Sequence, residues 1–107
     1  MAWVYLALAG VLEIVWAVGL RHTAGFTRFW PSIGTLVAIV ASLLLLGLAL
    51  RTLPLGTAYA VWTGIGAVGT VVLGIVLFDE IASLTRVLCV LLIVCGIVGL
   101  KLGTPDA

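Results

Sequence analysis

Residues 2–20 read AWVYLALAGVLEIVWAVGL, a run of 19 residues that is almost entirely apolar. A helix needs about 17–25 residues to cross the ~30 Å hydrocarbon core of a membrane, and the stretch falls within that range. It carries a single charged side chain, Glu13, near its middle. The sequence therefore predicts a membrane-spanning helix with one deeply placed carboxyl group.

Three further apolar runs follow, at residues 30–50, 56–78 and 84–101. Each is long enough to cross the membrane as a helix, and lipid cannot satisfy the hydrogen bonds of an open sheet edge. Pro31 opens the second run and Pro54 precedes the third, as expected at helix boundaries. We expect an all-α protein with four transmembrane helices, in one domain that covers residues 1–107.

The composition excludes several classes of protein. Of the 107 residues, 64% are hydrophobic and 8% are charged, with no Asn or Gln. A soluble domain carries about 25% charged residues. A soluble enzyme, a disordered tail and a nucleic-acid-binding protein are thereby excluded, and no metal site or cofactor is expected. Cys89 and Cys95 lie within the last run, where the simplest interpretation is that they are small buried residues.

The basic residues barely specify how the chain inserts. With four spans, Arg51 and Lys101 lie on one side of the membrane, and Arg21, Arg28 and Arg86 lie on the other. The positive-inside rule needs an excess on one side, and two against three is almost none. Either the topology is fixed but weakly specified, or both orientations form and pair as an antiparallel dimer.

Glu13 is the side chain that membrane packing explains least. An ionised carboxylate at the centre of a span costs at least about 2.5–3.5 kcal/mol, and such residues usually mark an ion or substrate pathway. No Arg, Lys or His lies at a similar depth in any of the four runs. We therefore interpret Glu13 as a group that binds a proton or a cation.

Small, hydroxyl-bearing and aromatic residues accompany Glu13. Residues three and four apart share a helix face, and this spacing selects one set of neighbours on the first run and another on the third. With a serine from the second run, the candidate pocket residues are Gly10, Trp16, Ser42, Tyr59, Trp62 and Thr63. Aromatic rings beside a carboxylate suit an organic cation, because charge pairing and cation–π attraction act together.

Glycines and cysteines suggest how the helices pack. Gly66, with Thr70 and Gly74, forms a ridge of small residues that allows close helix approach. Gly64 and Gly66 are alternatively a hinge that bends during a conformational change. In the last run, Cys89 and Gly96 are two turns apart on one face, which indicates a packing or dimer-contact helix.

Taken together, these residues resemble the small multidrug resistance transporters over essentially the whole chain. The motif residues are Glu13 and Trp16, then Gly25-Phe26-Thr27-Arg28, Trp30-Pro31-Ser32, Pro54, the block from Gly56 to Gly66, and Gly99-Leu100-Lys101. Within the family the chain is most similar to the guanidinium-exporter subtype. The tryptophan three residues after Glu13 carries much of that assignment, because exporters of polyaromatic cations have a small residue there.

The resemblance implies an antiparallel, dual-topology homodimer that exchanges protons for a guanidinium ion across a bacterial inner membrane. It assigns proton and substrate binding to Glu13 of both subunits, and it places Trp16, Ser42, Tyr59 and Trp62 around that site. It makes the fourth helix the main dimer contact and the segment around Gly64 and Gly66 a bend. It implies neither an enzyme nor a cofactor.

Three other functions stay open at this point. A broader exporter of quaternary ammonium ions in the same family would need a wider pocket than Trp16 leaves. A proton-carrying rotor subunit would also place a carboxyl group in mid-membrane, but it would form a ring and would not need the aromatic residues. A lipid-carrier transporter would be expected to work as a heteromer without aromatic residues at the carboxylate.

Overall fold

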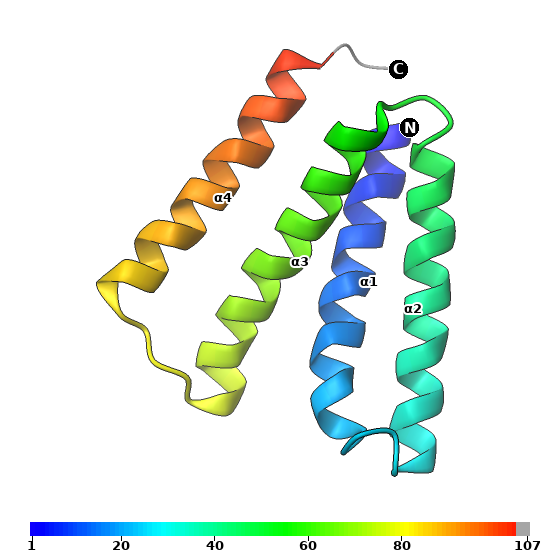
Figure 1. Ribbon diagram of the computed structural model, residues 1–107, viewed down its shortest axis with the longest axis vertical. Coiled ribbons are helices and arrows are strands. Elements are labelled where there is room, and N and C mark those ends of the chain that lie inside the picture. The colour runs from blue at the N-terminus through cyan, green and yellow to red at the C-terminus, as the bar shows by residue number, and fades with distance from the viewer. Residues whose placement is uncertain (105–107) are drawn as a thin grey trace.

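Four helices form all the regular structure in residues 1–104, the part of the chain that the computed structural model describes (Figure 1). They are α1 (Ala2–His22), α2 (Phe29–Ala49), α3 (Leu55–Phe78) and α4 (Leu84–Gly103). Each is long and apolar enough to cross a membrane. The predicted all-α fold with four spans is thus confirmed, and every helix begins and ends within about two residues of the expected bounds.

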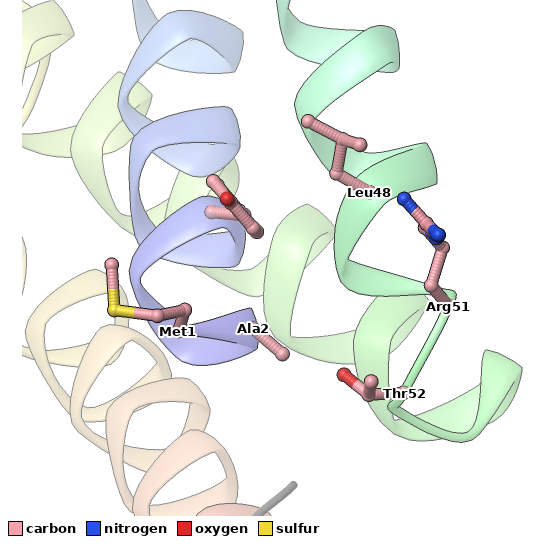
Figure 2. Close-up of a pocket in the computed structure, with 6 residues that line it drawn as sticks. Met1, Ala2, Leu48, Arg51 and Thr52 are labelled. Carbon is pink, nitrogen blue, oxygen red and sulfur yellow. The ribbon is translucent and has the colours of Figure 1, made fainter.

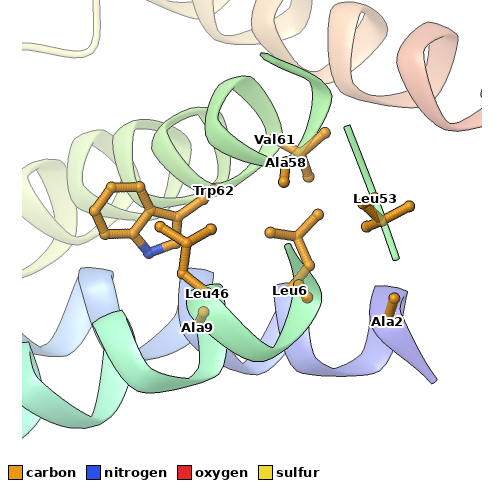
Figure 3. Close-up of a cluster of buried hydrophobic side chains, with 9 residues drawn as sticks. Ala2, Leu6, Ala9, Leu46, Leu53, Ala58, Val61 and Trp62 are labelled. Atoms are coloured by element: carbon orange, nitrogen blue, oxygen red, sulfur yellow. The ribbon is translucent and has the colours of Figure 1, made fainter. Parts of the chain in front are cut away.

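Helix α1 lies between α2 and α3 and contacts both along its length, whereas α2 and α3 contact each other little. One cluster of buried apolar side chains joins the three helices toward the end where α1 begins (Figure 3). Its members are Ala2, Leu6, Ala9, Leu46, Ala49, Leu53, Ala58, Val61 and Trp62. Four of these nine are alanines, and small side chains let helix backbones approach closely where lipid gives no hydrophobic drive.

Glycines on α1 and α3 bring these helices still closer. A methyl group on Gly10 would lie 2.6 Å from the Ile65 side chain of α3, and one on Gly69 would overlap Ile14 of α1. In both cases an isoleucine of one helix fills the space that a glycine of the other leaves. The α1–α3 interface is therefore fixed by packing on both sides of the level of Glu13.

Helix α4 is different, because none of its residues is buried. Its backbone comes close to that of α3 alone, and Ile93 and Ile97 pack there over Gly64. The helix leans away from α1 and α2 (Figure 1). Cys89 and Cys95 are both exposed, so the expectation that they are buried is wrong for the single chain. Each cysteine lies on α4, which is long enough to span the membrane and packs against protein on one face alone.

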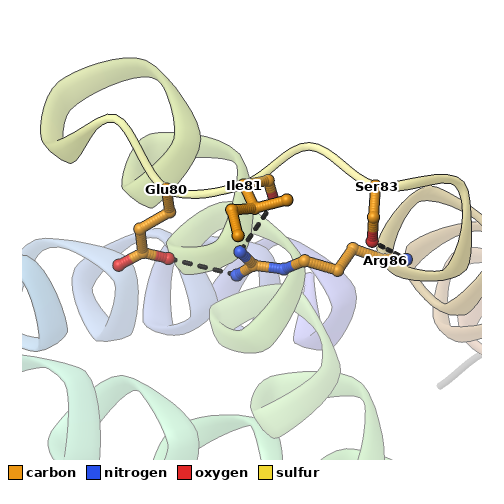
Figure 4. Close-up of polar contacts among 4 residues, drawn as sticks. All are labelled: Glu80, Ile81, Ser83 and Arg86. Carbon is orange, nitrogen blue, oxygen red and sulfur yellow. Dashed lines mark hydrogen bonds and ion pairs between the residues drawn. The ribbon is translucent and has the colours of Figure 1, made fainter.

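The connection from α3 to α4 is held by polar contacts between loop residues and the first turn of α4 (Figure 4). Arg86 pairs with Glu80 at 3.1 Å and donates a second hydrogen bond, of 2.8 Å, to the carbonyl oxygen of Ile81. The Ser83 side chain caps α4 by accepting from the backbone N–H of Arg86. These bonds fix the start of α4 even though its length has few neighbours.

Candidate functional site

The carboxyl group of Glu13 lies on the face of α1 that is turned toward α3, directly against Gly66. A methyl group built on Gly66 would overlap Glu13 Oε1 and would lie 2.5 Å from its Cδ atom. The other carboxyl oxygen, Oε2, is buried and has no hydrogen-bond partner. The glycine therefore makes the space that the carboxyl group occupies, and one oxygen stays unsatisfied.

No basic side chain of residues 1–104 compensates Glu13. The salt bridge in this part of the chain joins Arg86 to Glu80, which lies in the loop after α3. A buried carboxyl group without a partner is costly, and in a membrane such a group is either protonated or paired with a charge. Glu13 is thus chemically suited to exchange a proton for a cation.

A chain of hydrogen bonds joins three helices beside Glu13. The indole N–H of Trp62 on α3 donates to Ser42 Oγ on α2 at 3.0 Å. Ser42 Oγ in turn donates to the carbonyl oxygen of Ala9 on α1 at 2.7 Å. Ser42 is fully buried and Trp62 nearly so, so both bonds are shielded from lipid and water. Within this single chain, Ser42 and Trp62 therefore bond to each other and to α1.

The other predicted aromatic residues lie near this chain of bonds but are less enclosed. The Tyr59 ring packs against the Trp62 ring at 5.7 Å between centroids, and 54% of the Tyr59 surface is exposed. Trp16 lies one turn beyond Glu13 on α1, and its buried indole N–H has no acceptor. Two aromatic side chains thus have polar groups or surfaces that the single chain leaves free.

The remaining predicted residues have local roles. Thr63 donates to the backbone carbonyls of Tyr59 and Ala60 on its own helix, at 2.9 and 3.2 Å. Gly10 is covered by Ile65. Helix α3 runs without interruption through Gly64 and Gly66. These two glycines contact different neighbours, since Gly64 meets α4 and Gly66 meets Glu13.

Two parts of this arrangement were missed in the sequence. The Ala9 carbonyl is a backbone acceptor, and a backbone acceptor leaves no mark on residue type. Gly66 was placed on a packing ridge or at a hinge, but its nearest neighbour is the Glu13 carboxyl group. The signal that could have identified it is the pairing of a mid-span acid on one helix with a mid-span glycine on the next.

A cavity of about 500 Å³ lies away from this site, at the end of the bundle where α1 begins. Its lining residues are Met1, Ala2, Tyr5, Leu48, Arg51 and Thr52 (Figure 2). Arg51 gives it a positive charge, which disfavours a cation. This cavity is therefore not suited to a cation, and the unpaired carboxyl group of Glu13 lies elsewhere, at mid-membrane.

Comparison with known proteins gives a consistent result. Residues 1–93 match the family described as Small Multidrug Resistance protein. A protein of Yersinia pseudotuberculosis named guanidinium exporter is 61% identical over 104 residues, which cover 97% of this chain and 100% of that protein. Proteins of the same name from Citrobacter freundii and Klebsiella oxytoca are 59% identical over 104 residues, which cover 97% of this chain and 99% of theirs.

Four membrane-spanning helices, together with bacterial relatives named as exporters, define a multi-pass transporter of the inner membrane. Since the family match covers most of the chain, the protein belongs to the Small Multidrug Resistance family.

Replacing Gly66 by alanine should displace the Glu13 carboxyl group, because the added methyl group overlaps it. We expect Gly66→Ala to raise severalfold the rate at which a hydrophobic carbodiimide labels Glu13, measured by mass spectrometry of the purified protein. Gly47→Ala is the matched control, since its methyl group meets open space on α2. Equal labelling of the two variants would show that Gly66 does not position the carboxyl group.

Ser42→Ala should lower the free energy of unfolding, because it leaves the buried Trp62 N–H without its acceptor. Interhelical hydrogen bonds in membranes contribute about 0.6–2 kcal/mol, and we expect a loss of that size. The double variant Ser42→Ala/Trp62→Phe should cost less than the sum of the two single variants, because the stranded donor is gone. Denaturation in mixed micelles measures all three, with Ser32→Ala as control, and strict additivity would contradict the coupling.

Proposed function

We propose that this protein exports guanidinium ions in exchange for protons, with both ions competing for Glu13 in an antiparallel homodimer. One observation carries the proposal: a mid-membrane carboxyl group lies against Gly66 with one oxygen unpaired. The names of the relatives supply the cargo, since proteins about 60% identical over nearly the full length are guanidinium exporters. The substrate class thus rests on those relatives and on the chemistry of the site.

A guanidinium ion fits an isolated carboxylate well. It is planar and always charged, and its N–H groups match the two oxygens of a carboxylate. Glu13 Oε2 is an acceptor without a donor, and such an ion would satisfy it. Binding requires the ionised carboxylate, so a proton on Glu13 excludes the cation and the cation excludes the proton.

Aromatic side chains add to this attraction. Trp16 lies one turn from Glu13, and Tyr59 presents an exposed ring packed on Trp62. A desolvated cation over an aromatic face gains up to about 2 kcal/mol. The hydrogen bonds of Trp62 and Ser42 fix the position of the Trp62 ring, and we propose that this ring and that of Tyr59 line the cation pathway.

A second copy completes the site. One chain supplies one mid-membrane carboxyl group, and its fourth helix has no buried residue although it is long enough to span the membrane. Pairing through α4 would cover Cys89 and Gly96, which are exposed in the single chain. The balance of basic residues, two against three, is compatible with copies that insert in opposite orientations.

The exchange follows from competition at Glu13. If the dimer changes the side to which Glu13 is open only when it carries a proton or a cation, each passage outward of a cation is coupled to protons moving inward. The segment around Gly64 and Gly66 is the proposed bend of α3 in this change. A carboxyl group that binds either ion but not both is sufficient for the coupling.

The transport test uses the full-length protein in proteoliposomes. We expect a current on adding guanidinium and acidification of a weakly buffered medium as bound protons leave Glu13. Glu13→Gln should abolish both signals, because an amide neither releases a proton nor carries a charge. Glu80→Gln is the matched control, since Glu80 lies outside the spans, and it should retain the current.

The bulky cation tetrapropylammonium distinguishes a selective guanidinium exporter from a broader quaternary-ammonium exporter of the same family. Current with guanidinium alone supports the selective exporter, whereas equal currents with both cations would replace it by a broader quaternary-ammonium exporter. The absence of both current and acidification with either cation, or full signals in Glu13→Gln, would overturn the proposal.

The antiparallel arrangement predicts a cross-linking pattern along α4. In an antiparallel pair, residues near the middle of a helix meet their own counterparts, whereas residues at its ends do not. In a variant with Cys89 and Cys95 replaced by serine, we expect Gly96→Cys to form a disulfide-linked dimer in membranes and Leu102→Cys to stay monomeric. Efficient linkage at residue 102 alone would indicate a parallel dimer and contradict the arrangement.

A further inference from the structure

An apolar groove runs between α4 and the α1–α3 pair, away from the Glu13 carboxyl group. Its volume is about 260 Å³. The groove exists because α4 packs on α3 but diverges from α1. Its lining residues from α1 and α3 are Trp3, Leu6, Ala7, Val61 and Ile65, and those from α4 are Ile97, Val98, Lys101 and Leu102.

One end of the groove is polar. Lys101, in the last turn of α4, places its Nζ atom 5.0 Å from the centre of the Trp3 ring in the first turn of α1. These turns lie at the same end of the bundle (Figure 1), at the level where spans reach the membrane–water interface. Trp3 also has a buried indole N–H without an acceptor. The polar end thus offers a positive charge and an unsatisfied donor.

The present contacts leave most of this capacity unused. A cation–π contact attracts the lysine charge but accepts none of its three N–H bonds. No acidic side chain within residues 1–104 pairs with Lys101, since the salt bridge there is that of Arg86 and Glu80. A negatively charged oxygen acceptor at the interface would complement the lysine charge and its N–H groups.

The combination of a positive charge with an apolar groove favours an amphiphile over the transported cation. A positive charge repels guanidinium-type ions, and the rest of the groove is lined by apolar side chains. Basic pockets between transmembrane helices are suited to anionic lipid head groups. We propose that this groove binds an anionic phospholipid, with the phosphate at Lys101 and Trp3 and an acyl chain along Ile65 and Ile97.

This site is separate from the proposed dimer contact and from the cargo. Ile97 faces α3, whereas the neighbouring Gly96 has open space around its Cα atom. Lipid in the groove and a second copy on the Gly96 face can therefore be bound together. The lipid site does not depend on which cation the protein carries, and its test involves no transport.

Native mass spectrometry of the purified protein, mixed with equal amounts of palmitoyl-oleoyl phosphatidylglycerol and phosphatidylcholine, tests the proposal. We expect the wild-type protein to retain phosphatidylglycerol preferentially. Lys101→Gln should weaken that retention about fivefold, the effect of one basic side chain near a lipid phosphate. Arg51→Gln removes the same charge at the same end of the bundle but outside the groove, and it should leave retention unchanged.

A second pair of variants tests the apolar part. Ala7→Phe fills the groove while Lys101 stays in place, and it should abolish the preference, whereas Leu8→Phe on the exposed side of α1 should not. Size-exclusion chromatography checks that each variant is folded. Equal retention of the two lipids by the wild type, equal losses in Lys101→Gln and Arg51→Gln, or full retention in Ala7→Phe would overturn the proposal.

Discussion

The Glu13 carboxyl group lies against the backbone of α3 at Gly66, and the packing of α1 on α3 is organised around this contact. A carboxyl group in hydrocarbon must be covered by protein, yet it must have a free oxygen to bind an ion. The absence of a side chain at residue 66 meets both requirements, because it admits the group without supplying it a partner. The isoleucine–glycine contacts of Ile65 with Gly10 and of Ile14 with Gly69 keep the two helices at this distance.

The hydrogen bonds from Trp62 through Ser42 to Ala9 have a complementary effect. They satisfy the hydroxyl group of Ser42 on α2 and the indole N–H of Trp62 on α3 within the single chain. Each of the three helices contributes one group, so a rotation of any one helix breaks a buried bond. Glu13 Oε2 thus stays without a hydrogen-bond partner, as does the indole N–H of Trp16 one turn away.

The length and composition of the apolar runs were enough to predict all four helices, because a membrane span needs about 20 residues and charges mark its ends. Glu13 was equally visible, since it is the one charge deep in a span. The exposure of α4 could not be predicted, because a helix that is apolar on every side has no periodic pattern to show which face packs against protein. Cys89 and Cys95 were expected to be buried because cysteine is a small, usually buried residue, and both lie on the exposed surface of the single chain. The carbonyl acceptor at Ala9 could not be predicted from the sequence, because every residue has a backbone carbonyl group.

The lack of any buried residue on α4 bears on how the protein is made. Within residues 1–104, all buried side chains belong to α1, α2, α3 and the turns between them, which leave the ribosome first. Those three helices can complete most of their mutual packing while α4 is still being synthesised, since α4 contributes no buried residue and only Ile97 of it packs against the core cluster. The last helix to enter the bilayer is then the one without a buried residue, so the core of this protein can form before its final span is in place.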